Sequence, residues 1–267
     1  MPKRRQSWER LLRRAIGLAR ETESHAPATS FRRPLQTVAY GSLVRNRRYA
    51  EAVLALGRPS AYEARATIRS MIEIWGNYRW VRLRQPHSRA NRFVKSLALD
   101  HLRLLASLPA SQKGPNHAAL LRTLKRQRAQ SRHLFRIRVT KAGKTKLEWA
   151  RSWSKVSSFE TRIQEIVTAA PPTRRAGDEA IYFYYRWFSA AVHGSPFSLS
   201  ECIQDSPQGW RPRRQPERRP SASVAAATSC LSDTLLAACE DLCLAALRAR
   251  AQALQDEVIR LGRLPRR

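Results

Sequence analysis

The sequence predicts an all-α protein: a helical bundle with a long C-terminal helix and a basic, partly irregular excursion. Three observations predict this fold class. Glycine is scarce, at 10 of 267 residues. Ala, Leu and Arg, which favour helix over sheet, dominate the composition. Hydrophobic residues make up 43% of the chain and recur mostly at helical spacing, so we expect a core of ordinary size.

The first part of the chain is predicted to form amphipathic helices separated by short breaks. Ser60 and Glu63 have the spacing of a capping box, which predicts that a helix begins there. Gly57 and Pro59 end the helix before it. The predicted helices cover residues 7–21, 34–56, 60–84 and 88–108, with a further one from about 116 after a Gly-Pro break.

The second part contains a short alternating stretch at residues 135–140, which predicts a strand, and Gly143 predicts a turn after it. Helices are predicted over residues 147–167, 178–193 and 223–261. The Pro- and Arg-rich stretch between the last two is predicted to be disordered. We therefore divide the chain into a basic N-terminal helix with a linker, a helical domain, a disordered loop and a C-terminal helix that packs on the bundle, at residues 1–34, 35–204, 205–222 and 223–267.

The charge of the chain predicts a polyanionic partner. Lys and Arg total 50 against 20 Asp and Glu, a formal net charge of +30. A surface this positive binds nucleic acid because neutralising phosphates releases counterions. A high-GC genome would explain Arg in place of Lys, but it explains the shortage of acids less well. We expect nucleic acid as partner. The preference for RNA over DNA comes not from charge but from the chemistry of the polar residues on two helices.

The densest charge lies between residues 122 and 146, which contain ten Lys or Arg and no acid. Four of these cations fall at i, i+3, i+7 and i+11, which predicts a single helical face. A charge run is also typical of an ordinary solvated face. The residues we assign to nucleic-acid contact are Lys125, Arg128, Arg132, Arg136, Lys141, Lys144 and Lys146.

No metal site, cofactor site or membrane segment is predicted. The four cysteines form no Cys-x-x-Cys pair, and no cluster of Asp, Glu and His has ligand spacing. No stretch approaches the roughly 18 apolar residues that span a membrane. The basic N-terminus has no continuous apolar core of the kind found in secretory signals. We expect a cytoplasmic protein.

The helix predicted over residues 178–193 is apolar nearly all round, except for one polar line. Arg186, Ser189 and His193 lie on this line, and Tyr182 extends it by one turn. The line therefore combines a cation, a hydroxyl and an imidazole on a helix that is otherwise suited to burial.

A second polar line lies on the helix that begins after Ser60. Arg69, Glu73 and Asn77 fall at i, i+4 and i+8 among apolar neighbours. A charged residue inside an apolar helix needs a partner. Glu73 would bind either Arg69 in its own helix or Arg186 across the bundle. We expect the two helices to pack with their polar lines facing each other.

These lines have a structural interpretation and a functional one. A buried Arg–Glu pair often fixes helix register and does nothing else, and a histidine at a helix C-terminus is favoured by the helix dipole. Cleavage of RNA is the functional interpretation. Attack by a 2′-hydroxyl on its own phosphodiester needs a proton-transfer group such as His193 and a fixed cation such as Arg186, but no metal.

Two stretches carry a resemblance to a known family. Residues 68–77 (IRSMIEIWGN) and 182–195 (YFYYRWFSAAVHGS) resemble the two signature helices of the bacterial domain of unknown function numbered 5677, over about residues 35–200. The second stretch is also similar to the Arg-x(4–6)-His motif of HEPN domains, in the form Arg186-x6-His193. In active HEPN enzymes the residue after the Arg is often small and polar, whereas here it is Trp187.

The HEPN resemblance implies a function. Many HEPN domains are helical bundles that cleave RNA without metal, form homodimers in which two Arg–His motifs make one site, and act in phage-defence or toxin–antitoxin systems. By position, Arg186 would bind phosphate, His193 would transfer the proton and Glu73 would support them. Two other functions remain open: a non-catalytic nucleic-acid-binding module with a buried Arg186–Glu73 pair, and a DNA-associated accessory protein that uses only its basic surface.

Overall fold

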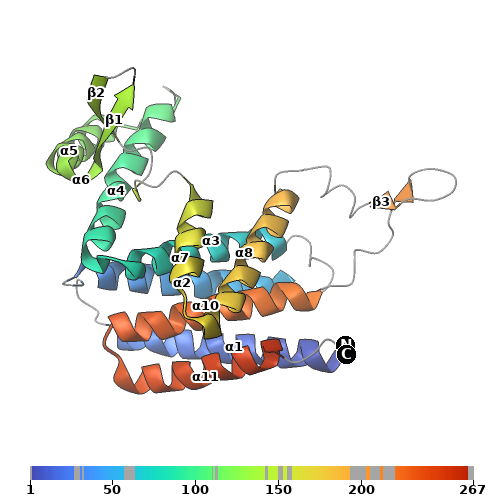
Figure 1. The fold of residues 1–267 in the computed structure, drawn as a ribbon. Helices are drawn as coiled ribbons and strands as arrows, with labels where there is room; N and C mark the ends of the chain where they lie inside the picture. Colours follow the sequence, from blue (N-terminus) through green and yellow to red (C-terminus); the bar gives the residue numbers. More distant parts are fainter. Residues whose placement is uncertain are drawn as a thin grey trace.

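The computed structural model consists mainly of helices, with one β-hairpin and a second, very short strand pair (Figure 1). The structure describes residues 2–26, 31, 33–56, 64–109, 111, 114–141, 144–149, 153–154, 158–192, 203–204, 211–212 and 220–263. This architecture confirms the predicted all-α class. In chain order its elements are α1 (Pro2–His25), α2 (Pro34–Leu56), α3 (Ala64–Leu83), α4 (Pro86–Ser107), α5 (His117–Gln130), α6 (Arg132–Phe135), β1 (Arg136–Lys141), β2 (Lys144–Trp149), α7 (Phe159–Ala169), α8 (Pro172–Val192), β3 (Ile203–Gln204), β4 (Arg211–Pro212), α10 (Pro220–Asp241) and α11 (Ala245–Arg263).

Helix α10 is the central helix of the bundle and packs against α1, α2, α3 and α11 (Figure 1). Its sequence is rich in Ala, Ser, Thr and Cys, whose small side chains allow close approach from several sides. Leu231 and Leu235 are fully buried in its interfaces. Buried polar groups on α10 form hydrogen bonds with neighbouring helices. Asn46 of α2, for example, donates a hydrogen bond to the Thr234 hydroxyl over 2.9 Å.

Helix α1 belongs to this bundle and packs on α10, α2 and α11. The apolar side expected for the N-terminal helix is buried, with Leu11 and Leu12 at 1% and 0% exposure. Helix α11 runs back along α1, so the start of α1 and the end of α11 lie close together in Figure 1.

Helices α7 and α8 lie side by side across α3 (Figure 1). Gly76 allows α7 to approach α3 closely, because a Cβ at this position would lie 2.7 Å from both the Ile163 Cδ1 atom and the Phe159 ring. This layer brings together the two polar lines predicted from the sequence.

Helix α4 leads from the bundle to residues 117–149, which we call the basic excursion (Figure 1). Helix α5 packs on α4, and β1 pairs with β2 as an antiparallel hairpin in which Thr140 lies opposite Thr145. The prediction of a strand over 135–140 is confirmed to within a residue. The prediction of a helix from residue 147 is wrong, because Leu147–Trp149 complete β2 and the next helix begins only after the Ser158 cap.

The predicted single helix over 223–261 is two helices. Helix α10 ends in a Schellman turn, in which the Leu244 amide donates to the Cys239 carbonyl over 2.9 Å and the Cys243 amide donates to the Glu240 carbonyl over 3.1 Å. Cys243 has a φ of 61°, a left-handed conformation in which glycine is usual. Because the chain has no glycine here, its sequence carries no signal for the break.

Helix α10 also corrects the statement that no stretch approaches a membrane span. Among the described residues, one stretch, Ala222–Asp241, is long and apolar enough to cross a bilayer by length and composition. However, most of this stretch is buried inside the bundle, as expected for a core helix. Its sequence mixes Ala and Cys with Ser and Thr, so its apolar residues do not form one continuous run.

Several predictions concern residues outside the described ranges, among them the capping box of Ser60 and Glu63, the turn at Gly143, and His193. Within the loop predicted to be disordered, Arg211–Pro212 pair with Ile203–Gln204 as short antiparallel strands.

Candidate functional site: a polar seam between α3, α7 and α8

The packing of α8 on α3 brings the two predicted polar lines together. Arg69 Nε donates a hydrogen bond to Ser189 Oγ over 3.0 Å, and Arg69 Nη2 lies 3.0 Å from Glu73 Oε1. Ser189 in turn donates to the backbone carbonyl of Tyr185 over 2.7 Å. The expected facing of the two helices is therefore observed. We call this group the polar seam.

Glu73 adopts the first of the two pairings left open by the sequence. Its carboxylate binds Arg69 four residues earlier and also accepts a hydrogen bond of 3.4 Å from the Tyr185 hydroxyl. The Arg69 guanidinium lies over the Tyr185 ring, 5.6 Å from its centroid. The side chains of Arg69 and Glu73 are 22% and 37% exposed, so the pair lies at the edge of the core and solvent reaches it.

Arg186 lies on the outer side of the seam. Its side chain is exposed, and among the described residues no ion pair or hydrogen bond joins it to Glu73. The predicted buried Arg186–Glu73 pair is therefore not formed. Asn77, one turn beyond Glu73, is half-buried, and its Oδ1 atom has no hydrogen-bond partner. His193 follows the last described residue of α8.

Tyr182 extends the seam to α7. Its hydroxyl donates a hydrogen bond to the Glu160 carboxylate. Burial, together with this negatively charged acceptor, raises the pKa of Tyr182 to about 12. The phenol therefore stays protonated at neutral pH and acts as a donor.

Arg162 of α7 is a seam neighbour that sequence reasoning missed. It is buried, its Nη1 atom donates to Ser154 Oγ over 2.9 Å, and its Nε atom has no hydrogen-bond partner. The guanidinium lies 5.7 Å and 5.5 Å from the ring centroids of Trp153 and Phe159. Burial lowers its pKa, while the charge of Glu73 acts in the opposite direction. An arginine flanked by Ile163 and Phe159 in a helix was a sequence signal for a buried cation.

A second, more deeply buried network was also missed. Asp233 of α10 accepts a hydrogen bond of 2.7 Å from the Trp75 indole, binds the Arg79 guanidinium at 3.3 Å, and accepts a hydrogen bond from Arg174. Asp178 lies 3.5 Å from Arg79 Nη2. Burial alone would raise the pKa of Asp233, but the two arginines and the indole together lower it. Burial raises the pKa of Asp178.

This network fixes the position of α8. Arg174 and Asp178 lie in the first two turns of α8, Arg79 lies on α3, and Asp233 lies on the central helix α10. The ion pairs therefore anchor one end of α8 to the bundle, and the helix carries Ser189 and Arg186 at its other end.

The predicted basic face is only partly a helical face. Lys125 and Arg128 lie on α5 and Arg132 begins α6, and all three are exposed, whereas Arg136 is half-buried at the start of β1. The face changes from helix to hairpin because α5 ends at Gln130. Lys146 is exposed on β2. The backbones of Lys141 and Lys144 pair across the hairpin, and only the backbones of these two residues are described.

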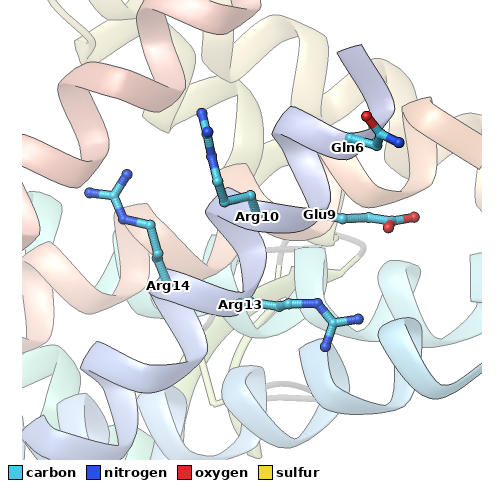
Figure 2. Close-up of a pocket in the computed structure, with 5 residues that line it drawn as sticks. All are labelled: Gln6, Glu9, Arg10, Arg13 and Arg14. Atoms are coloured by element: carbon cyan, nitrogen blue, oxygen red, sulfur yellow. The ribbon is translucent and has the colours of Figure 1, made fainter. Parts of the chain in front are cut away.

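Two hollows of the described surface lie away from the seam. One, of about 430 Å³, follows one side of α1 and is lined by Gln6, Glu9, Arg10, Arg13 and Arg14, whose side chains all come from this one helix (Figure 2). Another, of about 530 Å³, lies between the start of α8 and the end of α11, where it is lined by Thr173, Arg174, Asp256, Ile259, Arg260 and Arg263. Neither hollow contains a seam residue. Among the described residues, no three His, Cys, Asp or Glu side chains are placed to hold a metal ion together.

Comparison with known proteins identifies one family. No curated protein and no solved structure matches the chain significantly. The model of a family of unknown function, DUF5677, matches residues 36–209, a range that contains α3, α7 and α8, and therefore the whole polar seam, together with nearly all of α2. The chain belongs to this DUF5677 family of unknown function.

Proposed function

We propose that the chain binds RNA through the basic excursion and cleaves it, without a metal ion, at the outer edge of the polar seam. The observation that most supports this proposal is the position of Arg186. This exposed arginine lies one turn before Ser189 on the seam helix, has no ion-pair partner among the described residues, and is seven positions before His193. The likeness to the HEPN motif Arg-x(4–6)-His supports the same two residues.

The excursion supplies the binding surface in this proposal. Residues 117–149 contain one acid, Glu148, whereas seven of their cations are exposed. Phosphate contacts from such cations supply affinity that is independent of sequence. These seven are Arg122, Lys125, Arg126, Arg128, Arg132, Arg138 and Lys146.

The proposed reaction is a transesterification within the RNA strand, which is why RNA rather than DNA is the substrate. The 2′-oxygen attacks the adjacent phosphorus as His193 takes its proton. The bond from phosphorus to the 5′-oxygen then breaks, and the leaving oxygen takes up a proton. Arg186 would bind the non-bridging oxygens, whose charge grows in the transition state. The products would be a 2′,3′-cyclic phosphate and a 5′-hydroxyl.

The wider setting of this proposal rests on the HEPN resemblance alone. It supports a homodimer in which two Arg–His motifs share one site, an antitoxin as a further partner, a role in phage defence or as a toxin, and a cytoplasmic location.

The test is RNA cleavage in EDTA by the wild type and by His193→Ala. We expect the wild type to cleave and His193→Ala to lose activity by at least about a hundredfold, the usual contribution of a general base. The control is His101→Ala, which changes an exposed histidine on α4 and should retain full activity. Equal cleavage by the wild type and His193→Ala, or none by either, would contradict the catalytic proposal.

A non-catalytic RNA-binding module is the second candidate, and one observation favours it. Arg69, Glu73, Tyr185 and Ser189 satisfy one another, as expected if the seam only holds α8 on α3. In that case Arg186→Ala and His193→Ala would bind RNA as tightly as the wild type, with no cleavage by any of them.

A further inference from the structure

The outer face of α8 has an exposed aromatic side chain that the proposed reaction does not use. Phe183 is 65% exposed, the highest value among the exposed large hydrophobic side chains that the structure describes. The others are leucines on α4 and α5: Leu97, Leu104 and Leu120. Exposure of most of a phenyl ring to water is unfavourable, so the ring is available for a ligand that covers it.

The ring of Phe183 is held in place by its neighbours. Its centroid lies 5.9 Å from that of Tyr184 and 6.4 Å from that of Trp187, both half-buried. Trp187 is fixed in turn by the guanidinium of buried Arg65, 4.8 Å from its ring centroid. An aromatic face that is already ordered loses little conformational entropy when a planar group stacks on it.

A cation flanks the ring on the side of the polar seam. Arg186 follows Phe183 by three residues, which places it about 60° round the helix, and Ser189 lies about a further 60° round in the same direction. Arg186 therefore lies between the exposed ring and the seam. The exposed carboxylate of Glu179 lies one turn before Phe183 and would repel a phosphate. We therefore expect the phosphate of a ligand at the other end of the ring along the helix, toward Arg186.

We propose that Phe183 is a stacking platform for one unpaired base of single-stranded RNA, whose phosphate is bound by Arg186. This inference rests on the proposed function and adds the form of RNA that the site takes. An aromatic ring beside an arginine fits a base beside its phosphate, because stacking accepts any base and the cation binds the backbone. A second copy of the chain is the alternative occupant of this face, and the experiment distinguishes it from RNA by the oligomeric state of the variant.

The experiment compares three substitutions by fluorescence anisotropy with a short single-stranded oligouridine, in the His193→Ala background so that the RNA stays intact. Phe183→Ala removes the platform, Phe183→Trp keeps an aromatic face, and Leu104→Ala removes a side chain of similar exposure, 62%, on α4. We expect Phe183→Ala to bind about tenfold more weakly, and Phe183→Trp and Leu104→Ala to bind like the background. A fully paired RNA duplex should bind Phe183→Ala and the background equally.

Two results would overturn the platform. One is equal affinity of Phe183→Ala and the background for the single strand. The other is a dimer that becomes a monomer in Phe183→Ala, by light scattering, with RNA affinity unchanged, which would assign the ring to a protein interface. If RNA binding responds to substitutions in the basic excursion but not at Phe183, only the platform fails. If no RNA binds at all, the proposed function fails with it.

Discussion

The bundle and the basic excursion use the same residue type, arginine, in opposite ways. In the bundle, several arginines are neutralised by acids of the same or a neighbouring helix: Arg47 of α2 binds Glu51 of its own helix and Glu23 of α1, and Arg82 of α3 binds Glu240 of α10. In the excursion, Lys125, Arg126 and Arg132 are exposed and have no carboxylate partner among the described residues. Residues 117–149 carry ten Lys or Arg and one acid, so the excursion has a higher positive charge per residue than the chain as a whole, which carries +30 over 267 residues.

This difference separates two roles of charge. Ion pairs inside the bundle set the positions of helices, because each one satisfies a cation that would otherwise be costly to bury. Cations with no acidic partner add little to folding, and they remain available for phosphate. Substitutions in the two regions should therefore affect different measurements.

The largest effect on stability is expected for Asp233→Ala. The change leaves Arg79 and Arg174 without the carboxylate that binds both, and it leaves the Trp75 indole without an acceptor. Loss of one partner of a buried pair costs about 3–5 kcal/mol in the free energy of unfolding, to be measured in urea. Glu257→Ala is the control on the bundle surface, where Arg14 is the partner, and it should cost less than about 1 kcal/mol. Equal losses would remove the distinction between buried and surface pairs.

The same network predicts a pH dependence of stability. Because folding lowers the pKa of Asp233, its contribution is present above the unfolded value of about 3.9 and is lost as the pH falls through the folded value. The contribution of Asp178 to stability changes with pH in the opposite direction. Because folding raises the pKa of Asp178, its contribution is lost as the pH rises through the folded value. Asp233→Asn should therefore be destabilised at neutral pH and lose less stability on acidification than the wild type. Asp178→Asn should be the milder change at neutral pH, and the reverse order would contradict these assignments.

Gly76→Ala should have the next largest effect. The added methyl group would collide with the Ile163 and Phe159 side chains of α7 at 2.7 Å. Overpacking of this kind costs about 1–3 kcal/mol in the free energy of unfolding. Gly41→Ala is the matched control within a helix of the bundle, because nothing lies within 4 Å of a Cβ there. Urea unfolding of both variants measures the difference, and a destabilised Gly41→Ala with an unchanged Gly76→Ala would show that α7 does not pack this closely.

Cys243→Gly should stabilise the turn between α10 and α11. Cys243 has a φ of 61°, where a side chain costs about 1 kcal/mol relative to glycine. The gain in thermal unfolding should be below about 1 kcal/mol, because glycine also loses more entropy on folding. Cys243→Ala keeps a Cβ in place and should show no gain. If both variants gain equally, backbone strain is not the cause.

Much of the fold followed from helical spacing. The bounds of α2 agree with the prediction because Pro34 and Gly57 mark both ends, and the two polar lines were recognised because their residues recur at one-turn intervals. The Asp233 network has no such signal. Trp75 and Asp233 are 158 residues apart, and only tertiary packing brings them together. Arg162 did have a sequence signal, an arginine among apolar helical neighbours, but its contacts with Ser154 and Trp153, which precede its helix, come from the folded chain. The strand β2 was missed because its six residues are identified by pairing with β1 and not by their own pattern.

The smallest effect on stability, and the most direct test of the contrast between the two regions, comes from two matched triple variants. One replaces Lys125, Arg126 and Arg132 of the excursion with alanine, and the other replaces Arg20, Arg248 and Arg250, which are exposed on the bundle but paired with Glu51, Glu240 and Glu21. The measurement is the salt dependence of affinity for single-stranded RNA. We expect the free energy of unfolding of the excursion variant to lie within about 0.5 kcal/mol of the wild-type value. The negative slope of log affinity against log salt should be less steep by about 2. The bundle variant should keep the slope of the wild type. Unchanged slopes in the excursion variant, or an equal decrease in both, would contradict the assignment of RNA binding to the excursion.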